Sequence, residues 1–300
     1  MTIAEPLLAG VELGGTKCIA ALSRGNRIVD RAQWPTLEDA QATLGAIAAW
    51  LHAANAAEPI AALGIASFGP LSLDPASPHY GKLLNTPKLG WHGVDLIRTI
   101  ASELSCPVGL DTDVAGAALA EGLWGASTGA RSHVYCTIGT GIGTGVVIDG
   151  QPHHGTLHPE VGHVRVRRVA DPGFAGICPR HGDCLEGLAS GPAIAARTGR
   201  SAELLAPDHP VWSQVADEIG ELIAILILTL APEKIVIGGG VSHGQPGLLP
   251  LIRRASAYVL AGYMPGYDEA ALERLVVPPG LGPSAGVHGA ITLALRALRG

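Results

Sequence analysis

The sequence predicts an α/β protein made of two related domains. Strands and helices alternate, because short apolar runs that end in glycine-rich turns are separated by stretches whose apolar residues recur every three or four positions. One pattern also occurs twice: an apolar run, a glycine turn and a second apolar run open both 7–30 and 134–155. This repeat of a three-strand unit indicates two related halves, and we expect a ligand in a cleft between them.

Each expected element follows from this pattern in chain order. In the first half, apolar strands flank a turn at Gly14 and Gly15, and helical periodicity marks 38–55, 93–104 and 113–125. In the second half, strands at 134–138 and 146–148 flank a turn at 139–145. The remaining elements are a helix at 210–231, a third glycine-rich turn within 234–242 and a helix at 286–298.

The composition is that of a folded protein with large cores. Of the 300 residues, 47% are hydrophobic and only 15% are charged, so the chain is not expected to be disordered. The net charge of −6 and the lack of a Lys/Arg block argue against a nucleic-acid partner.

Three features predict a cytoplasmic protein with no membrane partner. The N-terminus lacks the basic start, apolar stretch and cleavage site of a signal peptide. The apolar segment 221–232 is too short to span a bilayer and lies beside Glu218, so we expect a buried helix. The five cysteines, an odd number, favour a reducing compartment over a disulfide framework, and Cys18, Cys106 and Cys136 lie in apolar runs typical of a core.

The three glycine-rich turns predict a polyphosphate ligand. Backbone N–H groups exposed in such turns form concave anion sites, and the hydroxyls of Thr16 and Thr140 and the charge of Lys17 add to them. The chain contains no P-loop motif, and the alternating glycines of 139–145 do not fit the dinucleotide-binding fingerprint. The alternative is that each turn is an ordinary hairpin turn.

A pair of carboxylates follows the strand at 108–110. Asp111 and Asp113 stand where that strand gives way to a helix, and a lone aspartate there is usually a helix cap. Ligands also gather at strand ends in α/β proteins, so one aspartate of the pair could cap the helix while the other accepts a hydroxyl proton in phosphoryl transfer.

Three further side chains are suited to gripping vicinal hydroxyls. Glu160 and His163 occur in HPEVGH, and Glu186 follows at a distance. Carboxylates and imidazoles make strong, directional hydrogen bonds to hydroxyl groups. The alternative for these residues is an exposed loop.

The stretch GICPRHGDCLEG has the short spacings of zinc ligands. Cys178, His181 and Cys184 offer the sulfur and nitrogen donors that zinc prefers. A structural site needs a fourth ligand, and spacing alone does not choose among the nearby candidates His153, His154, His158 and His163. A redox pair is disfavoured because the C-x-x-C spacing is absent, which leaves untethered loop cysteines as the alternative.

Together these motifs resemble the ROK family, the bacterial sugar kinases and sugar-sensing repressors of the actin-like ATPase superfamily. The resemblance covers nearly the whole chain and is carried by VELGGTKC, GIASFGPLSL, YGKLLNTPKLGW, DTDVAGAALAEG, YCTIGTGIGTGVVIDG, HPEVGHVRV, CPRHGDCLEGLASGPAIAAR and IVIGGGVS. The segments SFGP, TPKLGW and CPRHGDCLEG are typical of the fructokinase branch, whereas other ROK kinases usually carry an all-cysteine knuckle.

The resemblance implies two actin-like ATPase (ribonuclease H-like) domains with a cleft between them. One would comprise 1–115, with the C-terminal helix 285–300 packing back on it, and the other 116–284 with the zinc loop. It also implies that ATP, with Mg²⁺, phosphorylates the 6-hydroxyl of D-fructose to give fructose 6-phosphate. Sugar and ATP would be the partners of a cytoplasmic homodimer.

The resemblance then assigns roles residue by residue. Asp113 would be the catalytic base, and a structural zinc ion would be held by His163, Cys178, His181 and Cys184. Glu160, His163 and Glu186 would hold the sugar hydroxyls, so that the metal fixes the sugar-binding wall without touching the chemistry. The nucleotide would be bound by Gly14, Gly15, Thr16 and Lys17 of the first phosphate motif, by Gly139, Thr140 and Gly141 of the second, and by Gly239 and Gly240 near the adenosine.

Three alternatives remain beside a fructokinase. The first is a glucokinase, mannokinase or broad hexokinase of the same family, and the second is a non-catalytic sugar sensor. The third is a repressor, which would need a DNA-binding segment before the sugar domain, whereas the first phosphate turn begins within the first fifteen residues. The chain also departs from the family at Ala115, where members commonly have Asn, and this change could shift the sugar preference.

Overall fold

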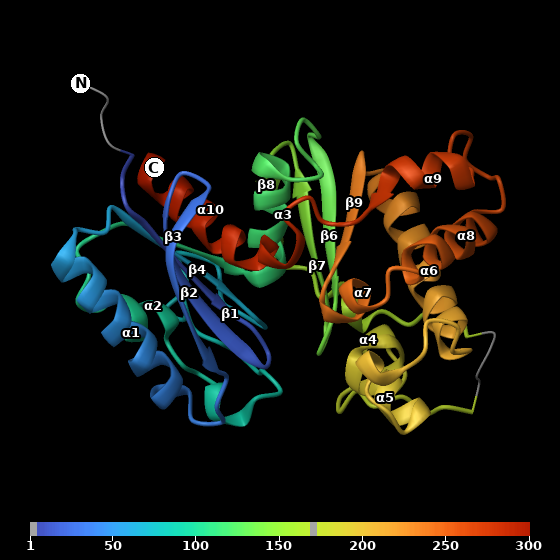
Figure 1. Cartoon of the computed structure of the whole chain (residues 1–300), viewed down its shortest axis with the longest axis horizontal. Helices are drawn as coiled ribbons and strands as arrows, with labels where there is room; N and C mark the ends of the chain where they lie inside the picture. The colour runs from blue at the N-terminus through green and yellow to red at the C-terminus, as the bar shows by residue number, and fades with distance from the viewer. Residues whose placement is uncertain (1–4, 169–172) are drawn as a thin grey trace. The chain divides into compact units, whose positions relative to one another are not determined.

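The computed structural model describes residues 5–168 and 173–300, which form two compact units. The first unit contains the chain up to Ala120, Pro152–Pro159 and Ser284–Gly300, and the second contains Glu121–Gln151 and Glu160–Pro283 (Figure 1). The chain therefore passes between the units within helix α3 (Asp113–Trp124) rather than after residue 115.

The first unit is built on a five-stranded mixed sheet. Its strand order is β3-β2-β1-β4-β5, with β2 antiparallel to β1 and β3, and with β4 and β5 parallel to β1. Helices α1 and α2 cover one face and α10 covers the other (Figure 1). The bounds are β1 Leu8–Leu13, β2 Lys17–Arg24, β3 Arg27–Pro35, β4 Ala62–Ser67, β5 Val108–Thr112, α1 Ala40–Ala57, α2 Leu96–Ala101 and α10 Ala285–Arg299.

The second unit repeats this sheet. Its order, β8-β7-β6-β9-β10, again places an antiparallel meander beside two parallel strands. The predicted duplication of a three-strand unit is therefore confirmed. The strands are β6 Ser132–Ile138, β7 Ile142–Ile148, β8 Gln151–Pro152, β9 Lys234–Gly238 and β10 Val276–Val277.

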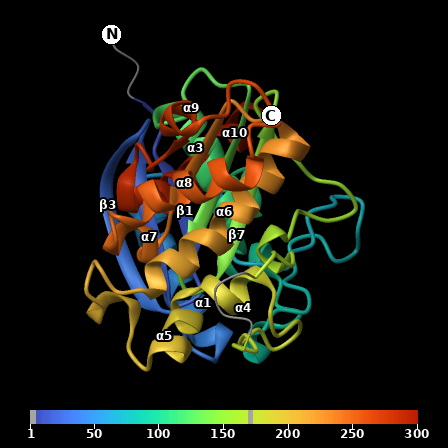
Figure 2. The same ribbon diagram turned by 90° about the vertical axis from the view of Figure 1, so that its right-hand side faces the viewer.

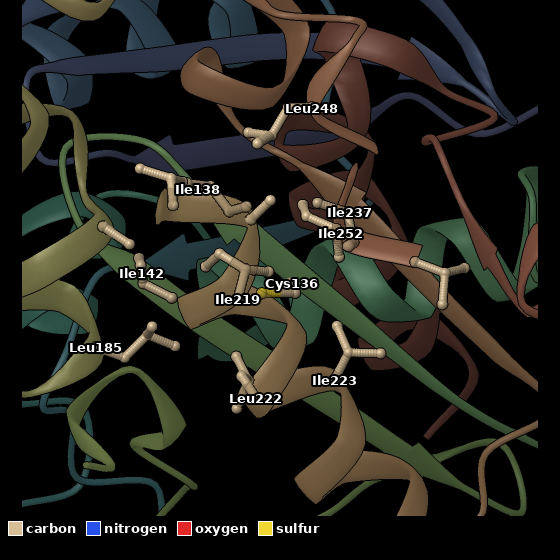
Figure 3. Packing of buried hydrophobic residues seen from close by; sticks show 14 of the residues in the cluster. Cys136, Ile138, Ile142, Leu185, Ile219, Leu222, Ile223, Ile237, Leu248 and Ile252 are labelled. Carbon is tan, nitrogen blue, oxygen red and sulfur yellow. The ribbon is translucent and has the colours of Figure 1, made fainter. Parts of the chain in front are cut away.

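Helix α6 (Val211–Leu230) forms the centre of the second core. Ile219, Leu222 and Ile223 project from it toward Cys136 of β6 and Ile237 of β9 (Figure 3). The prediction of a buried helix at 221–232 is confirmed for most of the segment: Leu222, Ile223, Leu226 and Ile227 are buried, whereas Leu228 near the end of the helix is 51% exposed. Within 5–168 and 173–300, none of the helices combines the length and apolarity that crossing a membrane requires.

Four long helices and the short α2 occur where periodicity predicted helices, whereas the long helix α8 and the other short helices were not predicted. The segments 38–55, 113–125, 210–231 and 286–298 correspond to α1, α3, α6 and α10, while 93–104 is helical only over α2. Helix α8 was not predicted and lies against α6 (Figure 2). Gly220 of α6 allows this close approach, because a Cβ there would lie 3.0 Å from the Ser256 nitrogen. The other helical segments are α4 Leu185–Ala189, α5 Gly191–Thr198, α7 Gly240–Gly244, α8 Leu248–Leu260, α9 Glu269–Leu275, η1 Leu89–Trp91, η2 Val161–His163, η3 Ala202–Leu204 and η4 Gly282–Ser284.

A row of glycines seats α10 on the first sheet. Gly10, Gly64 and Gly109 are in register across β1, β4 and β5, and all three face α10. A Cβ on Gly64 would lie 1.9 Å from the carbonyl oxygen of Ala290, and one on Gly109 would lie 2.3 Å from that of Leu293. Because these contacts are with backbone atoms, a side chain in the row cannot be accommodated by a rotamer change.

This packing predicts a large difference between two glycine substitutions. Gly64→Ala should lower the free energy of unfolding by about 1–3 kcal/mol or more, because overpacking must displace α10. Gly45→Ala is the control: Gly45 lies within α1 and its added Cβ meets nothing within 4 Å, so stability should rise by about 0.5–1 kcal/mol. Urea unfolding of both variants checks this, and equal stability of the two proteins would contradict the packing described.

Candidate active site

The first glycine turn joins β1 to β2 as a tight hairpin. The Gly14 N–H donates to the Lys17 carbonyl oxygen at 3.0 Å, and the Thr36 hydroxyl donates to the Gly14 carbonyl oxygen at 2.7 Å. A Cβ on Gly14 would lie 2.7 Å from the Lys17 oxygen, so glycine is required there. Thr16 and Lys17 remain exposed, as ligand-binding groups must be, and Gly15 lies beside them half-buried.

The second and third turns lie side by side in the second unit. Gly139 donates through its N–H to Gly141 at 2.9 Å in the β6–β7 hairpin, with exposed Thr140 between them. Gly239, at the end of β9, has φ +93°, and a Cβ there would lie 2.4 Å from the Ile138 carbonyl oxygen. A Cβ on Gly139 would lie 3.7 Å from the Gly240 nitrogen. Sequence reasoning identified both turns but could not show that they adjoin.

Asp113 is the first residue of α3 and follows β5 directly. Its Oδ1 accepts a hydrogen bond from the Val114 N–H at 2.9 Å. The expectation that one aspartate of the pair caps this helix is not met, because the Thr112 hydroxyl accepts from the Ala115 N–H at 3.2 Å. Asp111 is instead buried, with 3% exposure.

Asp113 and Glu12 have perturbed acidities. Burial raises the pKa of Asp113 to about 6, although backbone hydrogen bonds oppose the shift. Burial, followed by the charge of Asp113, raises the pKa of Glu12 to about 7, and Lys17 opposes this shift. Perturbed carboxyl groups of this kind are concentrated at functional sites. The signal for Glu12 in the sequence was a carboxylate in an otherwise apolar strand.

Two histidines considered as zinc ligands have other partners. His154 Nε2 lies 3.1 Å from Asp111 Oδ1, and buried His158 accepts at Nε2 from the Leu71 N–H at 3.0 Å. Both belong to the first unit. His163 lies in η2 of the second unit, near the cysteines, so the structure selects it as the fourth candidate ligand.

His163, Cys178, His181 and Cys184 form a compact cluster. The candidate ligand atoms all lie within 4.8 Å of one another. His163 Nδ1 is 3.4 Å from Cys184 Sγ and 3.9 Å from Cys178 Sγ, and His181 Nδ1 is 3.6 Å from Cys178 Sγ. Tetrahedral zinc with Zn–N of about 2.0 Å and Zn–S of about 2.3 Å requires nitrogen–sulfur separations close to these. The donor set and its spacing therefore fit a metal ion.

Glu186 connects this cluster to the second glycine turn. Cys184 immediately precedes α4, and Glu186 in the first turn of α4 accepts at Oε2 from the Ile142 N–H at 3.0 Å. A Cβ on Gly141 would lie 2.5 Å from the same oxygen. Glu160 is exposed, and its carbonyl oxygen accepts from the His163 N–H at 3.1 Å. The second unit thus carries all three predicted hydroxyl-binding residues, whereas Asp113 belongs to the first.

Comparison with known proteins identifies the chain. The ROK family model matches residues 8–297. The chain belongs to the ROK family. It is 44% identical to a fructokinase from Zymomonas mobilis subsp. mobilis, with 96% of each chain covered, and 40% identical to a putative fructokinase from Bacillus subtilis, with 98% of this chain and 97% of the relative covered.

A solved ROK structure shows the same fold. A ROK family glucokinase from Streptomyces griseus, in complex with glucose and AMPPNP, superposes with a TM-score of 0.78 at 26% identity, covering 97% of this chain and 99% of the other. The prediction of two actin-like ATPase (ribonuclease H-like) domains is confirmed by this likeness and by the repeated mixed sheet.

The raised pKa of Asp113 predicts a pH-dependent cost to stability. The unfolded carboxyl ionises near pH 3.8 and the folded one near 6, so the folded state binds more protons in this window and stability falls as pH rises through it. Asp113→Asn removes the buried charge. We expect the variant to melt a few degrees above the wild type at pH 8 and at the same temperature near pH 4. Calorimetry at both pH values checks this, and a variant that melts lower at pH 8 would contradict it.

Proposed function

We propose that this chain is an ATP-dependent fructokinase, which transfers the γ-phosphoryl group of ATP to the 6-hydroxyl of D-fructose. The observation that carries the proposal is 44% identity to a fructokinase over 96% of both chains. Identity to the Streptomyces griseus glucokinase is lower, at 26%, which favours fructose over glucose as the acceptor.

Asp113 would act as the general base. A carboxyl group with a pKa of about 6 is ionised at neutral pH and still accepts a proton more readily than an ordinary aspartate. It would take the proton from the 6-hydroxyl as that oxygen bonds to the γ-phosphorus and the bond to the β-phosphate oxygen breaks, leaving ADP.

The glycine turns would hold ATP. In the first turn, the exposed Thr16 hydroxyl and the Lys17 ammonium supply donor groups beside the backbone of Gly14 and Gly15. The second turn would meet the phosphates through Gly139, Thr140 and Gly141, and the adjoining Gly239 and Gly240 would lie toward the adenosine. Bound Mg²⁺ would supply positive charge that stabilises the phosphoryl oxygens.

Glu160, His163 and Glu186 would bind the sugar hydroxyls. The Nδ1 atom of His163 lies toward the two cysteines, which leaves Nε2 as the atom for a hydroxyl group. Glu186 uses Oε2 for the Ile142 N–H, which leaves Oε1. His163 and Glu186 would therefore each be oriented by one contact and bind sugar with the other polar atom of the side chain.

A structural zinc ion would be held by His163, Cys178, His181 and Cys184. Burial raises the pKa of the Cys184 thiol to about 11, with Cys178 and Glu186 adding to the shift, so without a cation this thiol stays protonated. Zinc binds cysteine as the thiolate and would hold η2 and α4 at one point.

Two further expectations accompany the proposal. The use of ATP and the five free cysteines support a cytoplasmic location. A homodimer remains a prediction from the family resemblance.

The central test compares sugars and variants. We expect ADP release from Mg-ATP to be fastest with fructose among fructose, mannose and glucose. Asp113→Asn should lower kcat by about 10²-fold or more, because general base catalysis is lost. Exposed Asp208 provides the control, since Asp208→Asn should leave kcat unchanged. Faster turnover of glucose than of fructose would show that glucose is the preferred substrate. An unchanged kcat in Asp113→Asn would show that Asp113 is not the base.

Zinc content gives an independent test. The purified protein should contain about one zinc per chain, and chelation in mild denaturant should release it and lower the melting temperature. Cys184→Ser should lose the metal, whereas Cys106→Ser, which changes a half-buried cysteine outside the cluster, should keep it. Full zinc content in Cys184→Ser, or none in the wild type, would be evidence against the site.

A further inference from the structure

The segment Pro152–Pro159 belongs to the first unit although the chain on both sides of it belongs to the second. Two imidazoles attach it. His158 accepts from the Leu71 N–H at 3.0 Å, and His154 contacts Asp111 at 3.1 Å. The mechanism described above uses neither histidine, and neither is part of the metal cluster.

His154 is the side-chain partner of a buried carboxylate. The side chain of Asp111 is 4% exposed and that of His154 is 30% exposed. Asp111 Oδ1 also accepts from the Thr112 N–H at 2.7 Å. An ionised carboxylate only accepts hydrogen bonds, so His154 donates from Nε2. Removing this donor would leave a buried charge short of a partner, which is a large penalty in a low-dielectric interior.

Asp111 is joined to the start of α3 by successive hydrogen bonds. It holds the N–H of Thr112, whose hydroxyl in turn accepts from the Ala115 N–H at 3.2 Å. Asp113 lies between these two residues and holds the N–H of Val114. A displacement of Asp111 is therefore passed to the backbone that carries Asp113. Catalytic groups must be held within about 0.5 Å of their productive position, so such a displacement matters.

We propose that His154 is a positioning residue for the phosphoryl-transfer reaction, acting through Asp111 to hold Asp113 in place. The inference rests on the proposed function, because Asp113 is assigned as the base there. All the contacts involved lie within the first unit.

The charges around Asp111 agree with this role. The hydrogen bond to Asp111 is the main cause of the raised pKa of His154. Burial opposes this rise, and the negative charge of Asp111 adds to it. Burial lowers the pKa of His158, which favours a neutral ring there. Burial and then the charge of Asp111 raise the pKa of Tyr80. Of the two histidines, His154 is therefore the one whose protonated, cationic form is favoured beside Asp111.

Steady-state kinetics on three variants tests the proposal. His154→Ala should lower kcat with fructose by about tenfold or more while the KM for ATP stays within about twofold, because a misplaced base slows chemistry without removing nucleotide contacts. His154→Gln should recover most of the rate, since its amide can donate to Asp111. The adjacent exposed His153 supplies the matched control, and His153→Ala should behave as the wild type.

The outcomes separate this inference from the proposed function. A wild type that turns over no hexose removes the proposed function and, with it, the inference. If the wild type is active, an unchanged kcat in His154→Ala overturns the positioning role. A His154→Gln variant as slow as His154→Ala also overturns it, because hydrogen bonding to Asp111 would then not be what the reaction needs.

Discussion

The first unit depends on the backbone contact between α10 and the glycine row of Gly10, Gly64 and Gly109. Three neighbouring strands each have a glycine at the same level of the sheet, so the helix can lie directly on their backbones. Two residues further along these strands, Glu12 and Asp111 lie on the same face, on either side of Ala66. A Cβ on Gly286, at the start of α10, would lie 2.1 Å from Glu12 Oε1. The packing that builds the sheet therefore also fixes the strand ends at the candidate site, and a looser helix would leave Glu12 less buried and lower its pKa.

The second unit positions its site residues in a different way. Among the described residues, His163 lies in the short helix η2, Cys178 lies in a loop, and Cys184 immediately precedes the short helix α4. Four candidate ligand atoms lie within 4.8 Å of one another there, and Glu186, two residues after Cys184, accepts a hydrogen bond from the Ile142 N–H in the second glycine turn. A metal ion suits such a segment, because it holds loops that burial alone would leave poorly fixed.

The sequence predicted what depends on local pattern. The repeated strand–glycine–strand unit and the buried helix α6 follow from periodicity, and the closeness of three candidate metal ligands follows from their spacing; the structure contains all three features. It could not choose His163 over His154 and His158, because that choice depends on which unit each histidine joins. The sequence also could not show the glycine row, because strand register is needed to see that the three glycines align. It did not predict the cap at Thr112, because the aspartates on either side are the more usual capping residues. The short helices α4, α5, α7 and α9 depend on tertiary packing. They could not be predicted because each has eight residues or fewer, which is too short to show a helical period.

The identity of the product is the most direct test of phosphoryl transfer to the 6-hydroxyl of fructose. Incubation with Mg-ATP and ¹³C-labelled fructose, followed by phosphorus and carbon NMR, reports which oxygen has received the phosphoryl group. We predict stoichiometric ADP and fructose 6-phosphate, with phosphorus coupled to C6. Phosphorylation at another carbon, or ATP hydrolysis without phosphorylated sugar, would contradict the assignment of Asp113 as a base acting on the 6-hydroxyl.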